Sequence, residues 1–248
     1  APRSPALMPD RDFSVQWNSA VRQRFGDTGP ELVLLDLDGT LIDSVPDLAA
    51  AVDIMLAALG REPAGQQQVS HWIGNGADML IRRALSCGDE DAANALTATE
   101  LQTPRQLFDT AYLSTLHQAT GVFPGVSDWL ERVTTPKILI TNKPRLFTVP
   151  LIDSLGWTGH FVRLICGDDF SEKKPSPMPL LKACEFADVN PSNALMIGDS
   201  RHDIGAAKAA AICSAAVTYG YNHGDDIALS HPDYLLNSLF DLMEPKNA

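Results

Sequence analysis

The feature that most constrains the fold is a run of apolar residues that ends in two aspartates. Residues 32–35 are all apolar, Asp36 and Asp38 follow with one residue between them, and Gly39 comes next. Such a run favours a strand buried on both faces, as in a parallel sheet. Gly39 permits a sharp turn and a close approach of the backbone to a ligand. Because open α/β sheets bind ligands at the carboxyl ends of their strands, we expect Asp36 and Asp38 to be the chemical centre.

Beyond residue 121, apolar runs alternate with helix-compatible stretches. Strands are expected at 137–140, 162–166, 194–197, 214–218 and 234–236. This alternation predicts βαβ units with parallel strands and right-handed crossovers. The sequence therefore predicts an α/β fold, a Rossmann-like doubly wound parallel sheet.

The stretch between the first strand and the second contains no convincing buried strand. Helices are expected at 46–59, at 77–85 and across 91–120, where Pro104 should break the helix or open a new one. We predict a helical cap domain (46–121) inserted into an α/β core domain (31–45 and 122–248), after the first strand.

An N-terminal extension (1–30) precedes the core. Within it Phe13, Trp17, Val21 and Phe25 recur every four residues, which predicts a helix with one apolar face. Such a helix would pack on its own domain, with partner binding as the alternative.

Charge and cysteine content limit the partners. The net charge is -12 at pH 7, and no basic stripe is visible, which argues against nucleic acid and anionic membranes. No apolar run is long enough to span a bilayer. The four cysteines are scattered without a CxxC pair, as in a reducing compartment. We expect a cytoplasmic protein with no nucleic-acid or membrane partner; monomer and dimer both stay open.

Polar groups follow three of the predicted strands: Asp36 with Asp38, Thr141 with Asn142, and Asp199. Parallel strands bring these endings to one edge of the sheet. Any one of them could simply cap a helix. That explanation is poor for two neighbouring carboxylates, which repel each other and are costly to desolvate.

A metal ion would relieve this repulsion. Asp36, Asp38 and Asp199, with Asp203 behind them, would form an all-oxygen site, and such donors favour Mg²⁺ over zinc. The cofactor we expect is therefore Mg²⁺.

Across the site, other groups could hold the oxygens of a phosphoryl group. Lys174 supplies a cation, Thr141 a hydroxyl, and the backbone amides of Gly39 and Asn142 can point inward. We prefer Lys174 to Lys173 because the proline after Lys174 fixes its direction; Lys173 is expected on the surface. One aspartate could then be a nucleophile that forms an aspartyl-phosphate, and the other a general acid and base.

Four motifs of this chain resemble those of the haloacid dehalogenase superfamily. They are DLDGT at 36–40, Thr141, the Lys-Pro pair at 174–175 and GDSRHD at 198–203. Within the superfamily the sequence is most similar to the bacterial phosphoglycolate phosphatases, through WIGNGAD at 72–78, TNKP at 141–144 and TYGYN at 218–222.

The resemblance implies a role for each motif residue. Asp36 would be the nucleophile and Asp38 the general acid and base. Thr141 and Lys174 would bind the phosphoryl group. The Mg²⁺ ligands would be Asp36, Asp199 and the backbone carbonyl of Asp38, with support from Asp203.

The resemblance also implies a small phosphorylated metabolite as substrate, with 2-phosphoglycolate the leading candidate. A phosphatase or phosphomutase acting on pyrophosphate, nucleotides or sugar phosphates is the alternative, and a non-catalytic scaffold is a third. For an anionic substrate the cap should offer cations, and His71, Arg82 and Arg83 are the candidates. The backbone amides of Gly74, Asn75 and Gly76 could serve instead, or this turn could simply start a helix.

Overall fold

The computed structural model describes residues 13–245, and a six-stranded parallel sheet forms its centre. In spatial order the strands are β6 (Arg163–Ile165), β5 (Lys137–Ile140), β2 (Leu32–Leu35), β7 (Ala194–Gly198), β8 (Cys213–Val217) and β9 (Tyr234–Leu236). The predicted Rossmann-like sheet is confirmed. The strand that ends at the two aspartates lies inside the sheet, as its four buried residues require.

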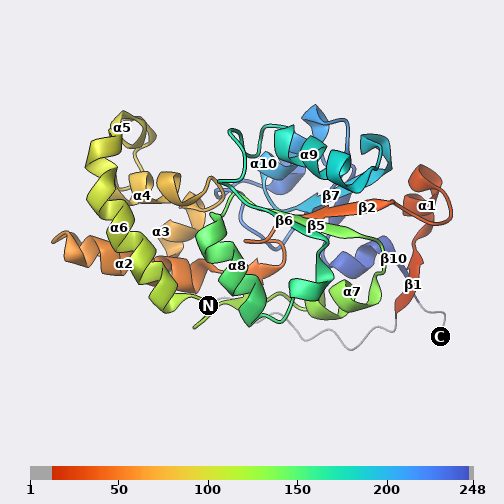
Figure 1. Cartoon of the computed structure of the whole chain (residues 1–248), viewed down its shortest axis with the longest axis horizontal. Coiled ribbons are helices and arrows are strands. Elements are labelled where there is room, and N and C mark those ends of the chain that lie inside the picture. Colours follow the sequence, from red (N-terminus) through yellow and green to blue (C-terminus); the bar gives the residue numbers. More distant parts are fainter. Residues whose placement is uncertain (1–12, 246–248) are drawn as a thin grey trace.

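Helices cover both faces of the sheet, because successive side chains of a strand point to opposite sides. Val33 and Leu35 belong to the hydrophobic cluster shared with α7 (Val126–Arg132) and α8 (Arg145–Ser154). Leu32 and Leu34 belong to the cluster on the other face, beneath α9 (Met178–Ala187) and α10 (Arg201–Ala209). Figure 1 shows these two helical layers above and below the strands.

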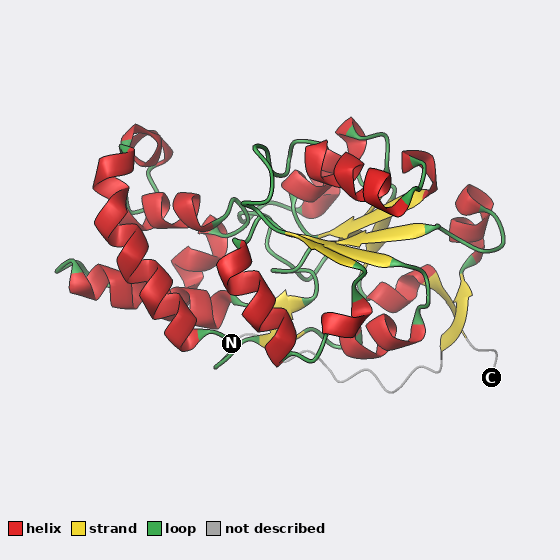
Figure 2. Ribbon diagram, viewed as in Figure 1, coloured by secondary structure: helices red, strands yellow, loops and turns green. Residues whose placement is uncertain are grey.

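Five helices form a separate unit at one end of the sheet (Figure 2). They are α2 (Val45–Ala58), α3 (Gly65–Trp72), α4 (Ala77–Leu85), α5 (Glu90–Ala95) and α6 (Ala98–Thr115). The unit has its own hydrophobic cluster, which also includes Phe147 of α8. Two short strands, β3 (Ile42–Asp43) and β4 (Gly121–Val122), pair antiparallel where the chain enters and leaves it. We call this unit the cap.

The prediction for Pro104 was wrong, since α6 runs through it without a break. The helix starts with a capping box, in which Thr97 and Glu100 bond each other's backbone amides. It also packs along α2. Buried side chains such as Phe108 and Tyr112 stabilise the helix enough to tolerate the missing amide hydrogen.

The single helix predicted around Phe13–Phe25 was also wrong. Residues 13–17 form β1 (Phe13–Trp17), which pairs antiparallel with β10 (Met243–Pro245). Asn18 then caps α1 (Ser19–Phe25), accepting a hydrogen bond from a backbone amide at 2.9 Å. Trp17 is buried edge-on against Trp129 of α7, so this segment packs on its own domain. The first twelve residues of the predicted extension lie outside the described residues.

Short 3-10 helices complete the chain. They are η1 (Thr158–His160), η2 (Pro191–Asn193), η3 (Ile227–Ser230) and η4 (Leu239–Leu242). Among residues 13–245, no helix combines the length and the apolar character that crossing a bilayer requires.

Candidate active site

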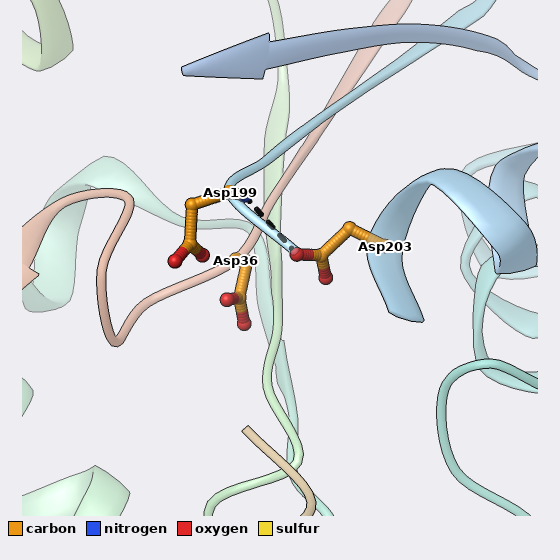
Figure 3. Close-up of side chains that lie close together, drawn as sticks. All are labelled: Asp36, Asp199 and Asp203. Carbon is orange, nitrogen blue, oxygen red and sulfur yellow. Dashed lines mark hydrogen bonds between the residues drawn. The ribbon is translucent and has the colours of Figure 1, made fainter. Parts of the chain in front are cut away.

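Three aspartates converge at the carboxyl ends of two neighbouring strands. Asp36 follows β2, Asp199 follows β7, and Asp203 lies in the first turn of α10. The strands are adjacent, with Leu35 opposite Ile197, so their ends must meet. One carboxylate oxygen from each aspartate lies within 4.8 Å of the others, and Figure 3 shows the three side chains side by side.

Lys174 joins two of these aspartates. Its ammonium donates to Oδ1 of Asp36, Oδ1 of Asp203 and the carbonyl of Ile140, each at 2.7 Å. Only 3% of Lys174 is exposed. Burial by itself lowers the pKa of Lys174, but the two carboxylates outweigh burial and raise that pKa above its ordinary value.

The cluster still carries more negative charge than Lys174 compensates. Burial, and then the charge of Asp203, raises the pKa of Asp36 to about 7. Burial, and then the charge of Asp36, raises the pKa of Asp199 well above its ordinary value. Both carboxyls would ionise more readily beside another cation.

Further hydrogen bonds hold the carboxylates of Asp203 and Asp199. Oδ2 of Asp203 accepts from the amides of Asp199 and Ser200 at 3.1 and 3.0 Å, and from the Ser200 hydroxyl at 2.9 Å. Asp199 accepts from the hydroxyl of Thr40 at 3.0 Å and from the amide of Tyr221 at 2.5 Å. The carboxylates are therefore held in place by the loops around them.

Glycine is required where these loops touch. A Cβ on Gly39, whose φ is +87°, would lie 2.2 Å from Oδ2 of Asp199. A Cβ on Gly220 would lie 2.2 Å from the Cβ of Asp199. The loops after β2 and β8 thus close on Asp199 only because both residues lack a side chain.

The three-aspartate cluster fits a hard divalent cation. Its ligand atoms are all carboxylate oxygens, and Lys174 balances only one of its three negative charges. Asp203 accepts four hydrogen bonds, from Lys174, the amides of Asp199 and Ser200 and the Ser200 hydroxyl, whereas Asp199 accepts two, so Asp203 suits a supporting position. The carboxylate of Asp38 is not part of the cluster, so the interpretation that placed it there needs correction. Asp38 could contribute only its backbone carbonyl.

The Asp38 carboxylate is instead held by two other residues. Ser44 donates to Oδ1 at 2.5 Å, and Lys143 donates to both oxygens at 3.0 Å. The sequence analysis gave Lys143 no role of its own, and its place in the TNKP motif that begins at Thr141 was the available signal.

Thr141 and Asn142 follow β5 and line the cleft described below. The Thr141 hydroxyl accepts from the amide of Lys143 at 3.1 Å. The Asn142 side chain donates to the carbonyls of Gly74 and Lys174 at 2.9 Å, and accepts from the Lys174 amide at 3.1 Å. Asn142 therefore connects the cap to the loop that carries Lys174.

A cleft lies between the sheet edge and the cap, and encloses about 470 Å³ including its open mouth. Its polar wall comes from the core: Asp36, Asp38, Thr141, Asn142 and Lys143. Its opposite wall is mostly apolar and comes largely from the cap: Leu48, Ile73, Gly74, Gly76, Ala77, Leu80, Phe108 and Tyr112, with Pro144 and Phe147 of the core.

The cap cations proposed from the sequence do not line this cleft. Arg82 donates to carbonyls at the end of α5. Arg83 is buried against the carbonyl of Trp72 and the side chains of Asn75 and Glu90. His71 is exposed. The contacts of Arg82 and Arg83 organise the cap, and His71 is exposed, so none of the three expected cap cations lines the cleft.

The two glycines of the Gly74–Gly76 turn lie at the cleft, but the side chain of Asn75 between them does not. Gly74 and Gly76 line the cleft, and Gly74 offers a carbonyl to the core. The side chain of Asn75 contacts His202 at 2.9 Å and is not among the lining groups. Lys173, expected on the surface, is half-buried beside Gly76.

Comparison with known proteins identifies the family. Residues 33–217 match the family model described as haloacid dehalogenase-like hydrolase. The chain belongs to this family. The match includes Asp36, Asp38, Thr141, Lys174 and the Asp199–Asp203 segment, and confirms the resemblance seen in the sequence.

Curated relatives and a solved structure agree with this family assignment. The chain is 46% identical to "Phosphoglycolate phosphatase 1" of Pseudomonas aeruginosa, over 91% of this chain and 83% of that protein. It is 47% identical to a phosphoglycolate phosphatase of Pseudomonas putida, with the same coverage. The crystal structure of a predicted phosphoglycolate phosphatase from Haemophilus somnus superposes with a TM-score of 0.79 at 33% identity, covering 85% of this chain and 95% of that one.

In this haloacid dehalogenase-like hydrolase, two tyrosines connect the site to the base of the cap. The hydroxyl of Tyr219 donates to the carbonyl of Thr40 at 2.8 Å. The hydroxyl of Tyr221 donates to Asp43 in β3, while its backbone amide holds Asp199. The sequence interpretation used both tyrosines only as part of the family resemblance. Their contacts become visible only when β8 and β3 are placed together.

Proposed function

We propose that this hydrolase is a Mg²⁺-dependent phosphatase that hydrolyses 2-phosphoglycolate through a phosphorylated Asp36. The observation that carries the proposal is the placement of Asp36 and Asp38 on the same cleft wall with different partners. Asp36 belongs to the acidic cluster, whereas Asp38 is held by Lys143 and Ser44. The names of the relatives support the choice of substrate.

We assign the nucleophile to Asp36. Lys174 holds Oδ1 of Asp36 and favours its ionised form against burial and Asp203, which raise its pKa, and Oδ2 is left to attack phosphorus. In this step the Oδ2–P bond forms and the bond from phosphorus to the leaving oxygen breaks. Thr141 and the backbone amides of Gly39 and Asn142 would hold the other phosphoryl oxygens.

We assign proton transfer to Asp38. In the first step Asp38 donates a proton to the leaving alkoxide, which releases glycolate. In the second step it takes a proton from the water that attacks phosphorus, and Asp36 is regenerated. The bonds from Lys143 and Ser44 hold the Asp38 carboxylate at the cleft during both steps.

Asp36 and Asp199, supported by Asp203, would hold Mg²⁺ together with the backbone carbonyl of Asp38. The ion would supply positive charge that neutralises the phosphoryl oxygens. The raised pKa values of Asp36 and Asp199 support this assignment, because Lys174 alone does not balance the negative charge of the cluster.

The cleft walls favour a small substrate. The apolar side chains opposite the aspartates offer no partners to the hydroxyls of a sugar phosphate, which would be buried without hydrogen bonds. A two-carbon phosphorylated acid needs few such partners. We place the reaction in the cytoplasm, where such small metabolites are found and where the free cysteines of this chain would stay reduced.

A substrate panel tests the proposal. With Mg²⁺, kcat/KM should be highest for 2-phosphoglycolate among pyrophosphate, nucleotides and sugar phosphates. Asp36→Asn should lower kcat by about 10⁴-fold or more, because the nucleophile is lost. Asp169→Asn is the matched control, since Asp169 pairs with Arg145 away from the cluster. An equal rate on all substrates would reject 2-phosphoglycolate, and an active Asp36→Asn variant would reject the mechanism.

A further inference from the structure

Among the described residues that line the cleft, Lys143 is so far used only to hold Asp38, and the buried hydroxyl of Tyr112 has no role in the proposed chemistry. We infer that Lys143 and Tyr112 together bind the carboxylate of the substrate and so select phosphorylated acids. This inference rests on the proposed function and adds the residues that determine its specificity.

Lys143 is the only cationic side chain among the described residues that line the cleft. It is almost fully buried, and its ammonium is shared between both oxygens of Asp38. The ammonium carries three hydrogens, so it can hold Asp38 and also donate to a substrate carboxylate that lies beside it.

Tyr112, in helix α6 of the cap, lies beside Lys143 of the core. The residue is 1% exposed, and its ring packs against Phe108 and Phe147, with ring centroids 5.6 and 4.8 Å away. The ammonium of Lys143 lies 4.9 Å from the centre of this ring. Lysine and ring thus form a cation–π pair inside the cleft.

The hydroxyl of Tyr112 is buried; the Lys143 ammonium lies beside it as a donor, and no group in the described part of the chain accepts its hydrogen. Leaving such a group unpaired costs about 1–3 kcal/mol, so phenylalanine would pack here at lower cost. The other buried donor without an acceptor in residues 13–245 is Nε1 of Trp129, which belongs to the core cluster and not to the cleft. The Tyr112 hydroxyl is therefore a donor at the cleft, next to a cation, that lacks an acceptor.

The geometry of 2-phosphoglycolate fits these two groups. Its carboxyl carbon is bonded to the carbon that carries the leaving oxygen. Asp38 must contact that leaving oxygen, and the Lys143 ammonium is 3.0 Å from Asp38. The carboxylate of a substrate in place for reaction therefore falls beside Lys143, and the Tyr112 hydroxyl can donate to it from the cap. Because the two groups come from different domains, the carboxylate would also hold the cap against the core.

The test compares kcat/KM for 2-phosphoglycolate with that for ethyl phosphate, which has the same length but no carboxylate. For the wild type this ratio should be on the order of 10². Tyr112→Phe keeps the ring and should lower the ratio by about tenfold, through a higher KM for 2-phosphoglycolate. Lys143→Met should lower the ratio by ~10-fold or more, and Lys143→Arg should restore part of it. Tyr234→Phe removes a hydroxyl from edge strand β9 and should leave the ratio unchanged.

The outcomes separate the inference from the proposed function. If the wild type hydrolyses both substrates equally well, the assigned substrate is wrong and the inference falls with it. If the wild type prefers 2-phosphoglycolate while Tyr112→Phe and Lys143→Met keep the full ratio, the function stands and the inference is overturned. If only Lys143→Met lowers the ratio, Tyr112 does not bind the carboxylate. Circular dichroism melting curves verify that each variant is folded.

Discussion

The two walls of the cleft differ in almost every physical respect. The core wall presents charged and hydrogen-bonding groups, of which Asp36 and Lys143 are buried and ion-paired. The cap wall presents side chains such as Leu80 and Phe108, with the buried hydroxyl of Tyr112. The difference indicates a division of labour: the core binds and cleaves the phosphoryl group, whereas the cap excludes water and limits the size of the substrate.

The residues that hold each wall in place from outside the cleft also differ. Behind the core wall, carboxylates are held by Lys174 and by backbone amides. Behind the cap wall, the arginines that might have bound substrate hold carbonyls and helix ends instead. The charged groups near the reacting atoms therefore belong to the core. Substitutions in the core should lower stability and activity more than substitutions in the cap.

The largest effect is expected from removing the buried cation of the core. Lys174→Met leaves Asp36 and Asp203 without their shared partner, and should lower the free energy of unfolding by about 3–5 kcal/mol in Mg²⁺-free urea titrations. The matched control is Lys137→Met, because Lys137 is also buried but, among residues 13–245, donates only to the Val133 carbonyl. This control should change stability by less than about 1 kcal/mol. Equal losses in both variants would show that the acidic cluster needs no specific cation.

A second prediction concerns Mg²⁺ and pH. The folded-state pKa of Asp36 is raised from 3.8 to about 7, so the metal-free folded state keeps a proton that the unfolded chain loses. Stability of the metal-free protein should therefore fall as pH rises through this range. Mg²⁺ replaces the proton, and at about 100 times Kd should raise Tm by about 5–10 °C near pH 8.

The rise in Tm should be smaller near pH 5, where Mg²⁺ must compete with the proton on Asp36. Differential scanning fluorimetry with and without chelator measures both values. Asp199→Asn serves as the comparison variant and should lose most of the Mg²⁺ effect. A rise that is larger at the lower pH would contradict the assigned ligands.

A third prediction compares one glycine from each region. Gly39 and Gly60 both have positive φ, but a Cβ on Gly39 would strike Asp199, whereas one on Gly60, after helix α2 of the cap, meets no atom within 4 Å. Gly60→Ala should cost about 1 kcal/mol from the backbone alone. Gly39→Ala should cost about 2 kcal/mol more, and should lower kcat by displacing Asp199. Equal costs in urea titrations would mean that the loop at Gly39 has room to relax.

The sequence predicted the elements of the core well, because buried parallel strands have a strong local signal. Strands β5 and β9 of the core begin and end where the pattern placed them. Helix α4 of the cap does so too. The failures occurred where distant packing outweighs local preference. Pro104 stays helical because α6 packs on α2, and residues 13–17 form a strand because β10 lies beside them.

The sequence by itself determined which groups gather at the sheet edge. Asp36, Thr141 and Asp199 each follow a buried strand. Because these strands are parallel, their carboxyl ends lie at the same edge of the sheet. Only the tertiary structure decided how these groups are partnered. It placed Lys143 on Asp38, and it brought the Tyr112 hydroxyl from the cap to the same cleft. The approach of Tyr112 depends on the angle at which the separately packed clusters of the core and the cap meet, and no local pattern in the sequence encodes that angle.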